Sequence, residues 1–107
     1  MHYVEWEVNM SVGNICIKTN KALSYACKCL PGVLNITTWY DTDSYRYYIV
    51  MHVNGNINKI KEYMSEIFGL EDALVKRFES ARDQIIYQGL DVDDLEEIQT
   101  LCRIMKC

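Results

Sequence analysis

The chain has 107 residues and a formal net charge of −4, and half of its residues are hydrophobic. This length and composition predict one folded domain over residues 1–107 and argue against global disorder. The negative charge disfavours direct binding to DNA or RNA, which basic surfaces mediate. No apolar run approaches the roughly 20 residues that a membrane helix needs, so we expect no membrane association.

The N-terminal residues alternate between apolar and polar side chains. In residues 4–10, valine, tryptophan and methionine alternate with glutamate and asparagine, which is the two-residue period of a half-buried strand. Residues 11–14 have the composition of a turn, and residues 15–18 alternate again. We therefore predict a β-hairpin over residues 4–18, followed by a short helix that begins near Thr19 and ends before Pro31.

A second hairpin follows. Residues 33–40 and 45–53 are rich in β-branched and aromatic residues, and the polar residues 41–44 lie between them as a turn. Beyond residue 56 the apolar residues recur every three or four positions, which predicts helices over 57–68, 70–88 and 91–105. Phe78 belongs to the apolar stripe of the second of these helices, and Asp91 can cap the third.

These elements predict an α+β fold. Its four-stranded antiparallel sheet consists of two hairpins, with a short helix between them and three C-terminal helices packed on it. An alternative begins the first helix near Val12 and gives a ferredoxin-like β-α-β-β-α core with a helical tail. Residues 30–36, Leu-Pro-Gly-Val-Leu-Asn-Ile, resemble a helix-to-strand junction of ACT domains. That resemblance implies a regulatory domain that senses a small ligand.

The sequence shows no local pattern for catalysis or for a cofactor. Its histidines are His2 and His52, and neither follows or precedes a nucleophile motif. Cys27 and Cys29 would point about 200° apart on a helix, which is poor geometry for a shared zinc ion. We expect no catalytic residue, no cofactor and no metal. A minimal Cys/His enzyme stays an alternative, because a sequence does not reveal contacts across the fold.

The cysteines bear on the compartment. The chain has five of them, and the N-terminus lacks the basic and apolar regions of a secretory signal. Both features predict reduced thiols and a cytoplasmic location, which would be the host cytoplasm for a phage or viral protein. A redox role of Cys27, Cys29, Cys102 or Cys107 stays open at this stage.

Aromatic and charged residues cluster at two places, and we predict that they bind a partner. At the second hairpin they are Trp39, Tyr40, Asp41, Asp43, Tyr45 and Arg46. On the last helix they are Asp93, Asp94 and Glu97. Tryptophan, tyrosine and arginine dominate the energetics of protein–protein interfaces, and an acidic face attracts a basic partner.

These observations favour a non-enzymatic, intracellular protein-binding module. We expect a small inhibitor of the kind that phages and mobile elements encode, such as an anti-CRISPR-like antagonist. Its acidic surface would occupy a groove of a nucleic-acid-binding protein. The apolar stripes of the last two predicted helices also allow a homodimer.

Overall fold

The computed structural model describes residues 2–79 and 82–105, with side chains from residue 11 onward. In these ranges the chain forms α1 (His2–Ala26), β1 (Val33–Asp41), β2 (Arg46–Val53), α2 (Ile57–Phe68), β3 (Leu74–Lys76), β4 (Asp83–Leu90) and α3 (Val92–Ile104). The strands form one antiparallel sheet in the order β1-β2-β4-β3. The prediction of an α+β protein with a four-stranded antiparallel sheet is confirmed.

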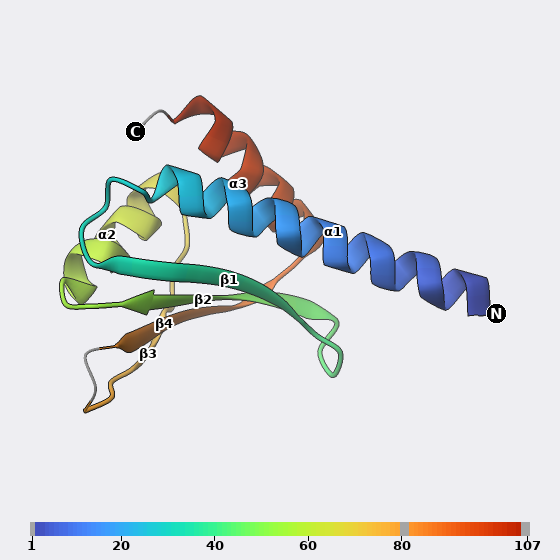
Figure 1. Cartoon of the computed structure of the whole chain (residues 1–107), viewed down its shortest axis with the longest axis horizontal. Helices are drawn as coiled ribbons and strands as arrows, with labels where there is room; N and C mark the ends of the chain where they lie inside the picture. The colour runs from blue at the N-terminus through green and yellow to red at the C-terminus, as the bar shows by residue number, and fades with distance from the viewer. Residues whose placement is uncertain (1, 80–81, 106–107) are drawn as a thin grey trace.

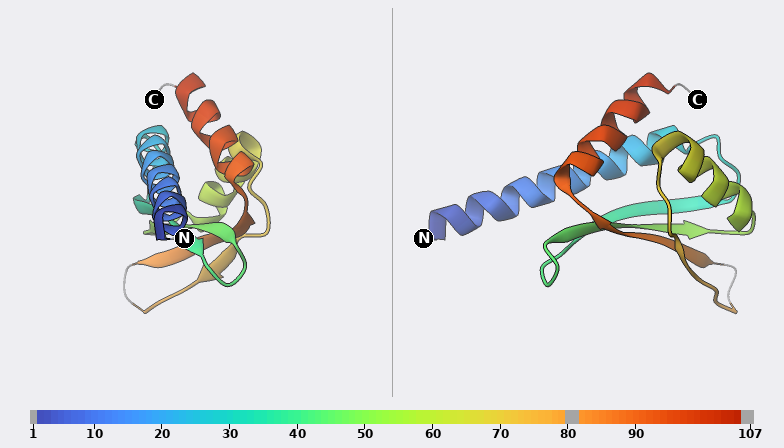
Figure 2. Two further views of the ribbon diagram at one scale, coloured as in Figure 1. Left: turned by 90° about the vertical axis from the view of Figure 1, so that its right-hand side faces the viewer. Right: turned by 180° about the vertical axis from the view of Figure 1, so that it is seen from behind.

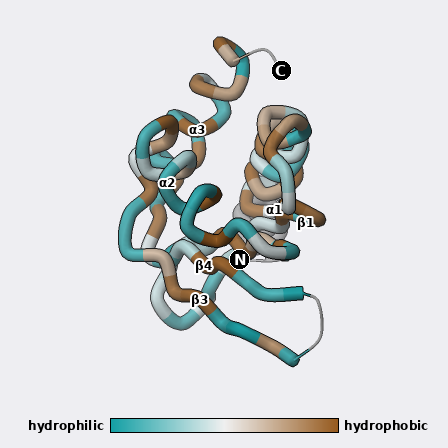
Figure 3. The backbone as a smooth tube through the Cα atoms, turned by 90° about the vertical axis from the view of Figure 1, so that its left-hand side faces the viewer, coloured by the Kyte–Doolittle hydropathy of each residue, from teal (hydrophilic) through white to brown (hydrophobic). Residues whose placement is uncertain are grey.

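The helices all pack on one face of the sheet (Figures 1 and 2). Ile49 and Met51 of β2 and Ile85 of β4 point toward them and are fully buried. The helices cover these strands with buried apolar side chains, which are Leu23, Ala26, Cys27, Ile57, Ile60, Met64, Phe68, Leu95, Ile98 and Cys102. Apolar and hydrophilic segments alternate along the helices in Figure 3, as one-sided burial requires. Within the described ranges, no helix covers the opposite face of the sheet.

The first predicted hairpin is wrong, because residues 2–26 form the single helix α1. From residue 11 onward, the apolar side chains of α1 follow a helical rather than a two-residue spacing. Val12 and Ile15 are partly buried against the core, and Leu23 is completely buried. The burial of this stripe outweighs the local strand-like alternation. The ferredoxin-like alternative is also wrong, because residues 4–10, which would form its first strand, belong to α1.

The predicted helix over residues 70–88 is wrong as well, because that segment forms the hairpin of β3 and β4. Ile85, Ile86 and Tyr87 are three consecutive buried residues. Ile86 lies on the face that the described helices leave uncovered, yet it is only 7% exposed, so β4 lacks the alternation that identifies a strand in sequence. Phe78, which was part of the predicted helical stripe, is instead exposed.

A polar contact joins the first and last helices. Thr19 is completely buried on α1, and its hydroxyl donates to the Ile15 carbonyl at 2.7 Å and accepts from the Gln99 amide of α3 at 3.1 Å. The N-terminal turns of α1 extend beyond the end of the sheet (Figure 1). None of the helices in residues 2–79 and 82–105 has the length and apolar character needed to cross a bilayer.

Candidate binding surface at the hairpin tip and the open sheet face

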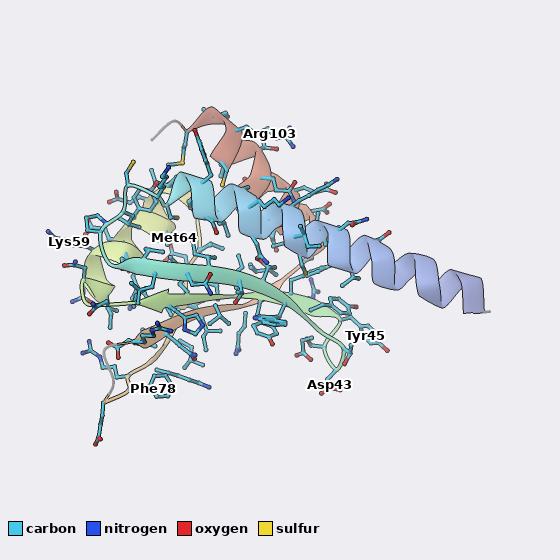
Figure 4. The ribbon with its side chains drawn as sticks, in the orientation of Figure 1. Asp43, Tyr45, Lys59, Met64, Phe78 and Arg103 are labelled. Carbon is cyan, nitrogen blue, oxygen red and sulfur yellow. The ribbon has the colours of Figure 1, made fainter. Side chains whose placement is uncertain are left out.

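The turn between β1 and β2 is built around Asp41. Its carboxylate accepts a hydrogen bond from the Asp43 backbone amide at 3.0 Å and one from the Ser44 hydroxyl at 2.9 Å. The Ser44 hydroxyl and the Asp43 amide hold the pKa of the Asp41 carboxyl below its ordinary value. These contacts fix the turn that presents the residues beyond it (Figure 4).

Tyr45 closes this turn in a left-handed backbone conformation, with φ of 57°. Such a conformation is uncommon for a residue with a bulky side chain, and glycine or asparagine normally occupies it. The Tyr45 side chain is nevertheless 77% exposed, so no core packing in the described chain offsets the backbone cost. A strained and exposed aromatic residue at a loop tip is a candidate contact residue.

The two predicted partner-binding segments meet in space. Because β2 pairs with β4, with Tyr47 opposite Leu90, the start of β2 lies beside the start of α3. The Arg46 guanidinium lies 3.6 Å from the Asp91 carboxylate. Asp91 is the N-cap of α3 and forms a capping box with Asp94. The Asp94 amide, helped by Arg46, lowers the pKa of the Asp91 carboxyl.

We define the tip surface as Trp39, Asp41, Asp43, Tyr45, Arg46, Asp91, Asp93 and Asp94. It carries five carboxylates and one guanidinium. Two of the nine predicted residues do not belong to it. Tyr40 lies on the helix-covered side, where its ring packs against Tyr47 at a centroid distance of 4.9 Å. Glu97 is exposed one turn further along α3. Asp91 was not predicted as a contact residue, although its role as a helix cap was.

The face of the sheet that the helices leave uncovered is apolar at its centre. Alternation along the strands places Trp39 of β1 and Tyr48 of β2 on this face, opposite each other in the register. The next row across the sheet contains Val50, Ile86 and Leu74. Val50 and Ile86 are only 8% and 7% exposed, because the larger side chains around them shield them. We call the outward residues Thr37, Trp39, Tyr48, Val50, His52, Leu74, Lys76, Gln84, Ile86 and Gln88 the open face.

A hollow of about 540 Å³ joins the open face to the tip surface. Its lining residues are Asp41, Ser44, Arg46, Tyr47, Tyr48, Lys76, Ile86, Gln88 and Gly89. The β3 and β4 members were not identified from the sequence, because their segment was predicted to be helical. The cluster of β-branched and aromatic residues at 85–87 was the one signal that could have identified this strand.

The thiols whose side chains are described do not form a nucleophilic pair with His52. His52 lies on the open face, whereas Cys27 and Cys102 are buried beneath the helices. Burial raises the pKa of Cys27 to about 12, with a contribution from Cys102, and raises the pKa of Cys102 to about 11. Both groups are therefore neutral thiols at physiological pH. The side chain of His2 and Cys107 lie outside the described residues.

Cys16, Cys27 and Cys102 are free thiols, as predicted. Cys29 is disulfide-bonded, so the prediction of reduced cysteines is wrong for this residue. The cytoplasmic location that was inferred from reduced cysteines stays a prediction. Among the side chains that the structure describes, no group of three or more potential ligands could hold a metal ion.

Comparisons with known proteins give no relative. No protein-family model matches the chain, and neither the curated proteins nor the solved structures that were searched include a match. The case for a function therefore depends on the geometry of the tip surface and of the open face.

Proposed function

We propose that this chain is a non-enzymatic protein-binding module that contacts a basic surface of its partner through the tip surface. The observation that carries this proposal is the 3.6 Å contact between Arg46 and Asp91. It unites two acidic segments that lie about 50 residues apart in the sequence. The resulting surface combines exposed aromatic residues with clustered carboxylates, which is a suitable composition for a protein interface with a basic partner.

The charge of the surface indicates the class of partner. Five carboxylates surround one guanidinium, so the local field is negative and attracts a positively charged surface. Proteins that bind nucleic acids present such surfaces, because they neutralise phosphates with lysine and arginine. An antagonist that occupies this kind of groove, in the manner of phage-encoded anti-CRISPR proteins, is the specific biological role that we propose. Its site of action would be the cytoplasm.

The exposed aromatic residues supply the expected energetic centre of the interface. Trp39 is 53% exposed, and its indole N–H donates to the Thr37 hydroxyl at 3.0 Å. This bond holds the ring in one orientation before any partner arrives, which lowers the entropy cost of binding. The turn around Asp41 sets the backbone conformation of Tyr45 and presents its side chain to the solvent.

The experiment that tests this proposal compares variants in a pull-down from a lysate of the native host. Trp39→Ala, Tyr45→Ala and Arg46→Ala change exposed side chains, so the melting temperature should change little. Tyr25→Ala is the matched control, because Tyr25 is an exposed tyrosine on α1. With the purified partner, at least one of the three variants should lose about 30-fold in affinity, and Tyr25→Ala should not.

The salt dependence of association tests the charge argument separately. Replacing Asp93 and Asp94 of the tip surface, together with nearby Glu97, by lysine should slow association at low salt and should have little effect at high salt. The proposal would be contradicted if all three alanine variants bound the partner as tightly as the unaltered protein does. An association rate that salt does not change would also contradict it.

One alternative has an observation in its favour. The hollow of about 540 Å³ lies within the range of small-molecule sites, so a ligand-sensing role is our second candidate. A thermal-shift screen with amino acids and nucleotides tests it, because a ligand that binds the folded state raises the melting temperature. Catalysis by a Cys/His pair is less well supported, since it needs a thiolate and burial keeps Cys27 and Cys102 protonated.

A further inference from the structure

The open face has the wrong composition for a surface that only contacts water. A solvated face of an antiparallel sheet normally carries polar side chains at its outward positions. Here the outward positions of neighbouring strands carry Trp39 and Tyr48 in one row and Val50, Ile86 and Leu74 in the next. Leu74 is 46% exposed at the edge of the sheet. Trp39 is 53% exposed and Tyr48 is partly exposed, whereas Val50 and Ile86 are buried and form the floor between them and Leu74. Apolar side chains exposed on neighbouring strands above a buried apolar floor indicate an interaction site.

We infer that the open face continues the tip surface and takes up the apolar side chains of a basic, extended segment of the partner protein. This inference rests on the proposed function and adds the chemistry of the bound segment. Lysine or arginine side chains of the segment would contact the carboxylates at the tip. Its alternate apolar side chains would lie on the row formed by Val50, Ile86 and Leu74.

The hollow provides the physical continuity between the two surfaces. Asp41, Ser44 and Arg46 line it from the hairpin tip, and Tyr48, Lys76, Ile86 and Gln88 line it from the open face. A single bound segment can therefore contact both sets of residues. Figure 4 shows that Asp43 and Tyr45 lie at the tip and that Phe78 lies beside β3, on the side away from the helices.

The charge distribution favours this occupant over two others. A second copy of the chain brings the same excess of carboxylates, with a net charge of −4 on each copy. Nucleic acid is a polyanion. The five carboxylates of the tip surface outnumber the two cations that line the hollow, Arg46 and Lys76. Both alternative occupants would therefore meet net repulsion, whereas a basic segment meets attraction.

Two synthetic peptides of ten residues test the inference. One alternates lysine with leucine and the other alternates lysine with serine, so both have the same charge and differ in apolar side chains. Binding is measured by fluorescence anisotropy of the labelled peptides. We expect the lysine–leucine peptide to bind about 10-fold more tightly or better, since burying one leucine-sized side chain has an effect of that size.

Variants separate the contributions of the two surfaces. Leu74→Ser should remove most of the preference for the lysine–leucine peptide and leave binding of the lysine–serine peptide unchanged. Ile104→Ser replaces an exposed aliphatic residue of α3 and is the matched control, so both affinities should stay the same. Asp41→Asn combined with Asp43→Asn should weaken both peptides, most strongly at low salt.

Four results would overturn the inference. If the two peptides bind equally, and only the aspartate variants weaken their binding, the tip surface stays a binding site and the open face is excluded. Failure of both peptides to bind would contradict the whole basic-segment model. A dimer in sedimentation experiments that Leu74→Ser dissociates would assign the open face to a second copy. Tighter binding of a 15-nucleotide thymidine oligonucleotide would assign it to nucleic acid.

Discussion

A single substitution at Gly13 distinguishes the observed helix α1 from the hairpin that the sequence predicts. In the hairpin it would occupy a turn that favours positive φ, where alanine is unfavourable. In the structure it lies within α1, and a Cβ atom added there meets nothing within 4 Å. Gly13→Ala therefore changes the helix propensity and the freedom of the unfolded chain without a steric clash.

The expected magnitude follows from the difference between glycine and alanine inside a helix, which is about 1 kcal/mol. Gly13→Ala should stabilise the protein by about this amount. For a domain of this size, that corresponds to a rise in melting temperature of about 4–8 °C. Urea denaturation followed by circular dichroism measures the change in the free energy of unfolding, and the denaturant slope should stay constant.

Gly32→Ala is the matched control. Gly32 has a φ of +91°, and a Cβ atom there would lie 3.0 Å from the Asn54 carbonyl oxygen. This substitution should destabilise the protein by at least about 1 kcal/mol. A loss of stability in Gly13→Ala similar to that in Gly32→Ala would refute the assignment of residue 13 to a helix.

Three further predictions concern buried and capping groups. Tyr87 is 1% exposed, and its hydroxyl has no hydrogen-bond partner among the described residues. Tyr87→Phe should therefore stabilise the fold by about 1 kcal/mol, whereas Tyr25→Phe, at an exposed position, should be neutral. A clear loss of stability in Tyr87→Phe would show that the hydroxyl is hydrogen-bonded. The pKa values of Cys27 and Tyr87 are raised to about 12 and that of Cys102 to about 11, mainly by burial, so the folded state holds these protons more tightly than the unfolded state does. Stability should be fully present below about pH 9 and decrease as the pH rises through 11, and a flat free energy of unfolding over this range would contradict the burial of these groups. Asp91→Ala should lower the melting temperature more than Asp91→Asn, because asparagine can still accept the Asp94 amide at the helix start; equal effects would exclude the cap as the cause.

The sequence by itself determined those helices and strands in which the spacing of apolar residues matches the one side that is buried in the fold. The hairpin of β1 and β2 was predicted almost to the residue, because Tyr47, Ile49 and Met51 face the helices and the residues between them face outward. Helix α2 was predicted because Ile60 and Met64 form one buried stripe and Gly69 ends the helix. The start of α3 was predicted from the capping chemistry of Asp91. In each case one side of the element is buried, so the local pattern and the tertiary environment agree.

Only the tertiary structure decided that the N-terminal segment is a helix and that β3 and β4 are strands. The alternation in residues 4–18 fits a strand locally, but burial of Leu23, Thr19 and Ile15 against the rest of the fold requires a helix. The segment with Ile85 and Ile86 lost its alternation because Ile85 is buried under the helices and Ile86 is buried among the side chains of the open face. The open face and the hollow beside the tip depend on β3 and β4, so neither could be predicted. The meeting of Arg46 with Asp91 likewise depends on the pairing of β2 with β4, which no local pattern encodes.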